Sequence, residues 1–210
     1  FGDAQKVDGK FGRGIKCDGE DDFARMGSLD ASKFTEYTAQ SWVMVENHTS
    51  EFSTVIGTAQ DGRTFLGINE ENFFEFKVFS GGAWRISPIT NESVEVKLGV
   101  WYHLAATYSE TNKVLKLYVN GTFISDTEIE NPSISTQSNY NYMCRGHTGS
   151  YLNGTIDHVS IWNRALSPEE IYYIFKKPKG FGEDYSHFRP EDGNHQSNPN
   201  STDTDGDMLS

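Results

Sequence analysis

The aspartates near the end of the chain have a spacing that suits a metal ion. Asp203, Asp205 and Asp207 occupy every second position of a short polar segment. Carboxylates at that spacing in a tight loop can converge on one calcium ion, as the first ligands of a calcium loop do. Because calcium takes six to eight oxygens, residues beyond 210 would have to complete the site. The alternative is a solvated acidic tail.

Two groups of aromatic and polar residues could bind carbohydrate. Glycan sites combine exposed aromatic faces with a few planar polar side chains. One group lies between residues 140 and 151, and the other lies beside the Gly81-Gly82 turn. The candidate ligand-binding residues are Trp84, Arg85, Tyr140, Tyr142, Arg145, His147 and Tyr151. The alternative for the aromatic residues is a place in the hydrophobic core, which we expect for Trp42, Trp101 and Trp162.

The residues that could perform catalysis are not grouped in the sequence. Glu128 and Glu130 are best explained as an exposed strand edge, and Glu169 with Glu170 fits the start of a helix. The six histidines are scattered, and no serine or cysteine has a base near it in sequence. We therefore expect a protein that is not an enzyme.

The composition excludes several partners. The 210 residues carry a formal net charge of -12, whereas phosphate binding needs a clustered positive surface, so nucleic acid and anionic membranes are disfavoured. No segment approaches the roughly 20 apolar residues that span a bilayer, so no direct membrane insertion is expected. An acidic surface is compatible with calcium and with an extracellular location.

Strands with alternating apolar and polar residues recur along the chain. Turn residues separate them, and Asn120-Gly121 predicts a tight hairpin because both residues tolerate positive φ. Short strands at this spacing predict an all-β sandwich or barrel. The expected strands are 41–45, 64–68, 73–79, 84–86, 93–98, 101–108, 114–119 and 156–162.

The cysteines and the glycosylation motifs point to the cell exterior. Cys17 and Cys144 share the strand phase of their apolar neighbours, which permits either two buried thiols or one disulfide. An extracellular setting would favour the disulfide. Asn-x-Ser/Thr motifs, which suit a secreted or surface glycoprotein, occur at Asn47, Asn91, Asn120, Asn153 and Asn200.

The end of the main domain has helix signals. Ser167, Pro168 and Glu170 match the N-cap, first position and third position of a capping box. This predicts one short C-terminal helix. Residues 177–202 lack an apolar period and have the composition of a linker.

Five segments, in order, resemble the laminin G-like domains of the concanavalin A-like lectin/glucanase class. They are the opening strand 8–19, the strand 41–43, the strand 101–105, the hairpin 115–121 and the closing strand and helix 152–171. The resemblance implies a two-sheet antiparallel jelly-roll sandwich over residues 1–176. Residues 203–210 resemble the start of a thrombospondin type 3 calcium repeat.

The resemblance also implies a second calcium site. Related jelly rolls hold calcium between the loop after the opening strand and the closing strand, which makes Asp18, Asp22 and Asp157 candidate ligands. The alternative is that Asp18-Gly19 is a plain turn and Asp157 accepts backbone hydrogen bonds. Related glycosidases carry a Glu-x-Asp-x-x-Glu pattern, which Glu128-Ile129-Glu130 does not complete.

These observations favour a non-catalytic recognition module of a secreted or cell-surface protein. It would bind glycan or another surface protein, with calcium as the cofactor. The alternative is a structural subunit of an extracellular filament, layer or adhesive assembly, in which copies of the chain associate with one another.

Overall fold

A computed structural model describes residues 4–26, 34–48, 52–58, 64–130, 132, 141–146 and 150–177. Several residues named above lie outside the described residues. They are Tyr140, His147, Asn200, Asp203, Asp205 and Asp207. The linker and calcium repeat expected after residue 177 therefore remain predictions.

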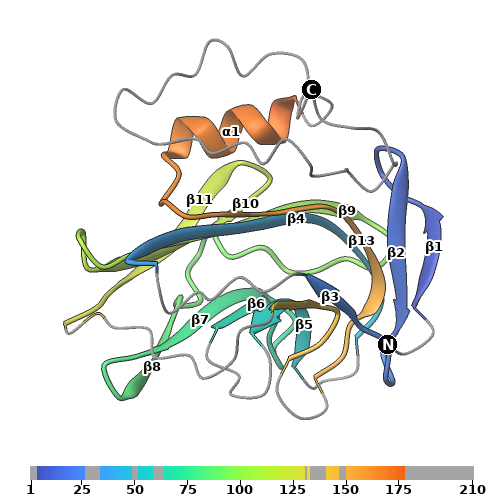
Figure 1. Ribbon diagram of the computed structural model, residues 1–210, viewed down its shortest axis with the longest axis horizontal. Helices are drawn as coiled ribbons and strands as arrows, with labels where there is room; N and C mark the ends of the chain where they lie inside the picture. Colours follow the sequence, from blue (N-terminus) through green and yellow to red (C-terminus); the bar gives the residue numbers. More distant parts are fainter. Residues whose placement is uncertain are drawn as a thin grey trace.

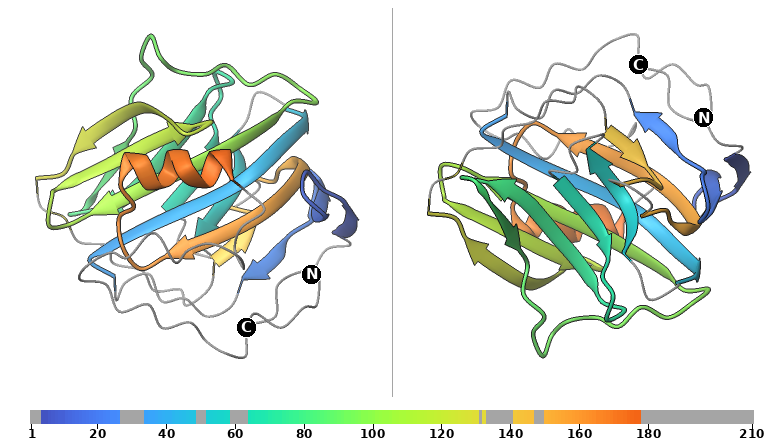
Figure 2. Two further views of the ribbon diagram at one scale, coloured as in Figure 1. Left: turned by 90° about the horizontal axis from the view of Figure 1, so that it is seen from above. Right: turned by 90° about the horizontal axis from the view of Figure 1, so that it is seen from below.

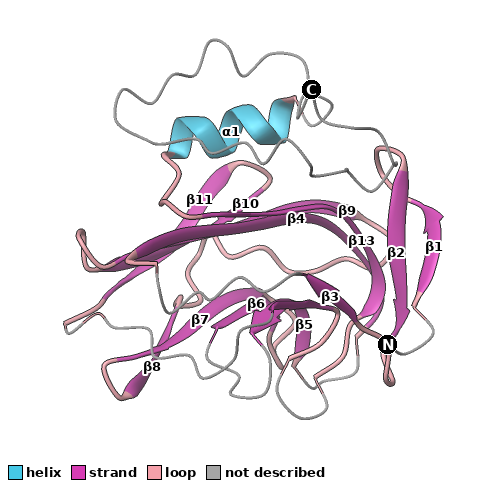
Figure 3. Cartoon of the chain, viewed as in Figure 1, coloured by secondary structure: helices cyan, strands magenta, loops and turns pink. Residues whose placement is uncertain are grey.

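Two antiparallel sheets stack face to face, and the single helix of the described residues lies on one of them (Figure 1; Figure 3). The larger sheet has seven strands in the order β1 (Gln5–Asp8), β2 (Arg13–Asp18), β13 (Asn153–Trp162), β4 (Glu36–Asn47), β9 (Trp101–Ser109), β10 (Val114–Val119) and β11 (Thr122–Glu128). The smaller sheet has six, in the order β3 (Ala24–Met26), β12 (Asn141–Met143), β5 (Ser53–Thr58), β6 (Thr64–Ile68), β7 (Phe74–Ser80) and β8 (Ala83–Ile86). The predicted jelly-roll sandwich is confirmed.

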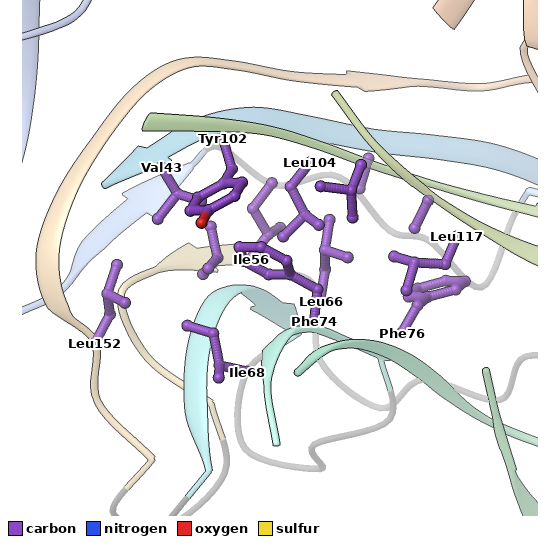
Figure 4. Packing of buried hydrophobic residues seen from close by; sticks show 14 of the residues in the cluster. Val43, Ile56, Leu66, Ile68, Phe74, Phe76, Tyr102, Leu104, Leu117 and Leu152 are labelled. Atoms are coloured by element: carbon purple, nitrogen blue, oxygen red, sulfur yellow. The ribbon is translucent and has the colours of Figure 1, made fainter. Parts of the chain in front are cut away.

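The core lies between the sheets and follows from strand alternation. On β7, Phe74, Phe76 and Val78 are buried, while the residues between them point to the other face. Tyr102 and Leu104 on β9 meet them from the larger sheet (Figure 4). The apolar layer is therefore made of every second residue of facing strands.

The helix α1 (Pro168–Lys176) begins as the sequence predicts. The Ser167 hydroxyl accepts a hydrogen bond from the Glu170 backbone N–H, and the Glu170 carboxylate accepts one from the Ser167 N–H at 2.8 Å. Arg164 donates two further hydrogen bonds to the same carboxylate. Ile171 and Ile174 anchor the helix on the outer face of the larger sheet. No helix among the described residues is long and apolar enough to cross a membrane.

The tryptophans differ from the expectation. Trp42 is buried, but it lies on the outer face of the larger sheet, where its ring stacks on Phe175 of α1 at 5.7 Å. Trp101 and Trp162 are only partly buried. The reason is that α1 creates a second apolar layer outside the sandwich, which strand alternation alone does not reveal.

Two expected strands are also altered. Residues 93–98 form only an isolated bridge, between Phe73 and Glu95. The closing strand β13 has an irregular register between Asp157 and Ser160, where His158 has a φ of 47°. Strict alternation from Ile156 would place Val159 and Ile161 on the opposite face, but the bulge shifts the alternation and both pack against the same core as Ile156.

Protonation of His103 is predicted to weaken the fold in acid. His103 lies beneath α1, and burial lowers the pKa of its imidazole to about 4. The unfolded chain takes up this proton near pH 6.5, so stability is complete above that pH and falls as the pH drops towards 4. We expect a loss of about 3 kcal/mol from this group.

Urea unfolding at pH 7 and pH 4 of the wild type and of His103→Gln measures this effect. The variant should lose less free energy of unfolding across the interval, because glutamine does not titrate. Equal losses in the two proteins would show that His103 does not contribute to the pH dependence.

Candidate functional site

The outer face of the six-stranded sheet is a sheet surface that no described helix covers, although the residues of its central strand β6 are buried. Seen from below in Figure 2, this sheet faces the viewer with no described helix over it, whereas α1 covers the other sheet. Cross-strand partners share a face, so the register defines which side chains line it. One row across the sheet consists of Arg25, Tyr142, Gly57, Phe65, Lys77 and Ile86.

Trp84 provides an exposed aromatic surface at one edge of this face. It lies on β8 opposite Phe79, and the two rings meet edge to face at 5.6 Å. The Trp84 side chain is 43% exposed although its neighbour holds the ring in place. A fixed, exposed indole is suited to stacking against the apolar face of a sugar ring.

Lys77 lies beside Trp84 and is surrounded by aromatic rings. Its ammonium is 3.4 Å from the ring centre of Phe52, 4.8 Å from that of Phe65 and 5.7 Å from that of Trp84. Phe52 and Phe65 themselves meet edge to face at 4.4 Å. These cation–π contacts fix the position of the charge.

Glu75 supplies an acceptor next to the Lys77 donor. Its carboxylate is 3.7 Å from the ammonium and also accepts a hydrogen bond from the Asn69 amide at 3.4 Å. Burial raises the pKa of Glu75 and lowers the pKa of Lys77, while their mutual attraction opposes both shifts. The pair is therefore a partly desolvated hydrogen-bond donor and acceptor, and its ammonium lies 5.7 Å from the ring centre of Trp84.

A second cluster lies at the opposite edge of the same face. Tyr142 on β12 contacts Phe23 edge to face at 5.4 Å, and the Arg145 guanidinium lies 4.9 Å from the Phe23 ring centre and 5.7 Å from that of Tyr142. Tyr151 pairs with Arg145 through an isolated bridge. The structure thus brings three of the predicted ligand-binding residues together, and they are Tyr142, Arg145 and Tyr151.

A disulfide holds this second cluster to the rest of the sandwich. Cys17 on β2 of the larger sheet is bonded to Cys144, which directly follows β12 of the smaller sheet. Cys144 has a φ of 65°, which turns the chain immediately before Arg145. The bond therefore connects the two sheets at the residue that precedes the guanidinium.

Arg85 does not join its neighbour Trp84, contrary to the expectation. Adjacent strand residues point to opposite faces, and Arg85 pairs with the core residue Val78. Its Nε atom is buried and has no hydrogen-bond partner among the described residues. Arg85 therefore belongs to the inner side of the sheet.

The acidic loop after β2 gathers three carboxylates. Oxygens of Asp18, Asp21 and Asp22 lie within 4.8 Å of one another. The Asp18 carboxylate accepts a hydrogen bond from the Glu20 N–H, and that of Asp22 accepts one from the Asp18 N–H. Asp21, which the predicted ligand set omitted, completes the cluster because the turn brings it back beside Asp18.

Asp157 does not belong to this cluster, and that expectation is corrected. Asp18 pairs with Asn153, whereas Asp157 pairs with Trp42 four residues further along β13, a separation of about 13 Å. Its carboxylate accepts hydrogen bonds from the backbone of Phe11 and His158. Burial raises the pKa of Asp157, but the hydrogen bonds from His158 and Phe11 outweigh this and hold it below its usual value.

The described glycosylation motifs fall into two groups. Asn47 and Asn91 are exposed. The Asn120 side chain accepts a hydrogen bond from the His103 N–H, and the Asn153 amide donates one to the Asp18 carbonyl. The last two side chains are thus already used in turns.

Sequence reasoning missed the residues that hold the site together. Phe23 and Phe52 lie in loops, Phe65 lies on β6, and Glu75 and Lys77 lie on β7. The only signal was the alternation of β7, which places Glu75 and Lys77 on the face away from the core.

Loss of the disulfide is expected to destabilise the protein. Replacing Cys17 and Cys144 together by serine should lower the free energy of unfolding by about 2–5 kcal/mol, because the unfolded chain is no longer constrained. Urea unfolding measures it. Reductant should lower wild-type stability to the level of the variant and leave the variant unchanged. A wild type that is insensitive to full reduction would contradict the prediction.

Comparisons with known proteins agree with the architecture. No curated protein matches the chain. Domain 4 of AbnA, an extracellular arabinanase from Geobacillus stearothermophilus solved with arabinotriose, is 21% identical, with a TM-score of 0.67 over 83% of this chain and 82% of that one. The binding domain of Paraclostridial Mosquitocidal Protein 1 is 17% identical (TM-score 0.66, 83% of this chain and 46% of that one). That of Botulinum Neurotoxin serotype G is 14% identical (TM-score 0.62, 84% and 45%).

These likenesses show a shared fold, and the chain spans less than half of the two toxin domains. Enzymes share the fold too, such as Trypanosoma rangeli sialidase (14% identity, TM-score 0.59, 82% of this chain and 29% of that one). The sequence itself matches one family over residues 18–172, which is most of the chain. The protein therefore belongs to the Concanavalin A-like lectin/glucanases superfamily.

Proposed function

We propose that this chain is a non-catalytic carbohydrate-binding module. Its binding surface is the outer face of the six-stranded sheet. The observation that carries the proposal is the exposed indole of Trp84 beside the Lys77–Glu75 pair, which aromatic rings hold in place. An oligosaccharide would stack on Trp84 while its hydroxyl groups exchange hydrogen bonds with the ammonium and the carboxylate.

The charges on this face support binding rather than turnover. Glycoside hydrolysis requires two carboxyl groups on either side of the scissile bond. Here the Glu75 carboxylate is paired with an ammonium and an amide. The similar arabinanase domain was solved with arabinotriose, and the similar toxin domains are named as binding domains, which fits a recognition role.

Replacement of Trp84 tests the proposal. Trp84→Ala should weaken oligosaccharide binding by about 2 kcal/mol, or roughly thirtyfold, because a central aromatic contact is lost. A glycan array would identify the ligand, and isothermal titration with that ligand would measure the change. Tyr172→Ala is the matched control, because Tyr172 is a similarly exposed aromatic residue on α1, at 51%.

The control variant should bind as the wild type does. If Trp84→Ala also binds normally, the site lies elsewhere. If no glycan on the array binds the protein, either with or without calcium, the proposal that the module binds carbohydrate is overturned.

We also propose that calcium binds at Asp18, Asp21 and Asp22. Support comes from the approach of the three carboxylates, since calcium prefers such oxygen ligands and fills its shell with carbonyls and water. Millimolar calcium should raise the melting temperature of the wild type, because a ligand that binds the folded state stabilises it. Asp18→Asn with Asp21→Asn should abolish the rise, and Asp126→Asn, on the far strand β11, should retain it. A wild type without any calcium response would exclude the site.

An extracellular location completes the proposal. The disulfide supports it, because such bonds persist in oxidising compartments. The exposed Asn47 and Asn91 are the better glycan acceptors of the described motifs, since their side chains are accessible.

A further inference from the structure

We propose that Arg145 forms a second subsite on the same sheet face and binds the carboxylate or sulfate group of an acidic sugar. The inference rests on the proposed carbohydrate binding and adds the chemical class of the ligand. It starts from a guanidinium that is held against two rings and has no acidic partner in the part of the chain that the structure describes.

The rings set the orientation of the guanidinium. Its central carbon lies 4.9 Å from the ring centre of Phe23 and 5.7 Å from that of Tyr142. The two rings support each other edge to face. An arginine that rests on aromatic faces keeps its in-plane N–H groups available, and these match the two oxygens of a carboxylate or sulfate.

Among the described residues, the Arg145 guanidinium has no acidic partner, unlike the cationic groups of Lys16, Lys77 and Arg164. The sequence has 30 acidic and 18 basic residues, and Lys16, Lys77 and Arg164 each have a carboxylate within 3.7 Å. The Arg145 guanidinium has no ion pair or hydrogen bond in the described part of the chain.

The backbone around Arg145 is fixed before any ligand arrives. Cys144 is bonded to Cys17, and Arg145 itself bridges to Tyr151. Tyr142 lies on β12, which pairs on both sides, with β3 and β5. A donor group that is already ordered loses little conformational entropy when it binds, so its hydrogen bonds contribute more to affinity.

The ligand would be an oligosaccharide because the subsite shares its face with Trp84. Tyr142 and Lys77 belong to one register row. The strands β12 and β8 are four steps apart in the sheet, a span of roughly 19 Å. An extended chain of sugars could therefore stack on Trp84 at one end and present an acidic group to Arg145 at the other.

Oligogalacturonate and its methyl ester provide a matched pair of probes, since esterification removes the charge and keeps the sugar chain. Isothermal titration of the wild type should give at least about tenfold tighter binding of the acid. Arg145→Gln should lose this preference and bind the ester unchanged. Arg145→Lys should retain only part of it, because lysine keeps the charge without the planar fork. A sulfated oligosaccharide in a third arm distinguishes sulfate from carboxylate.

Equal binding of acid and ester by the wild type, or an Arg145→Gln variant that keeps the preference, would overturn the inference. If either of these results occurs while Trp84→Ala still loses oligosaccharide binding, the proposed carbohydrate-binding function remains supported. If the wild type binds no oligosaccharide, titration with sodium sulfate tests whether Arg145 binds an anion at all. Sulfate binding that Arg145→Gln removes would support the anion subsite and overturn the carbohydrate proposal, and no sulfate binding would overturn both.

Discussion

The alternation of strand β7 is the constraint on which the rest of the structure depends. Burying Phe74, Phe76 and Val78 between the sheets forces Glu75, Lys77 and Phe79 onto the opposite face. A shift of one residue would expose the core and bury the charges, so the hydrophobic effect fixes the register strongly. The candidate site is thus the reverse side of the core, and its residue positions follow from the same pairing that stabilises the fold.

The helix decides which of the two outer faces can serve as a binding surface. On the larger sheet, Trp42 and His103 lie beneath Phe175, and Tyr118 packs in the layer anchored by Ile171. Aromatic residues there are used to attach α1. On the smaller sheet, no described helix lies above the strands β7 and β8, which carry Lys77 and Trp84. Residues of similar chemistry therefore have different roles on the two sheets, and the position of a single helix makes the difference.

The sequence was sufficient for the fold but only partly for the site. Local signals, such as alternation and the capping box at Ser167, predicted the strands, the sandwich and the helix. The failures occurred where tertiary contacts add to or override local patterns: α1 buries Trp42 on the outer face of the larger sheet, and the bulge at His158 changed the faces of β13. Likewise, Asp21 joins Asp18 only through the shape of a turn. Clusters built from several strands depend on register, which composition and spacing do not specify.

A contribution to folding stability does not explain why the protein has the Lys77–Glu75 pair. Burial opposes the charge on both groups, raising the pKa of Glu75 and lowering that of Lys77, so the protein spends folding free energy to hold them half-desolvated. Replacing a desolvated ion pair by apolar residues is often neutral or stabilising, so folding alone does not require these charges. A fold that keeps such a pair beside an exposed indole instead has a donor and an acceptor already partly stripped of water. Binding a hydroxyl group there costs less desolvation, which is the reason to connect the pair with ligand recognition rather than with folding.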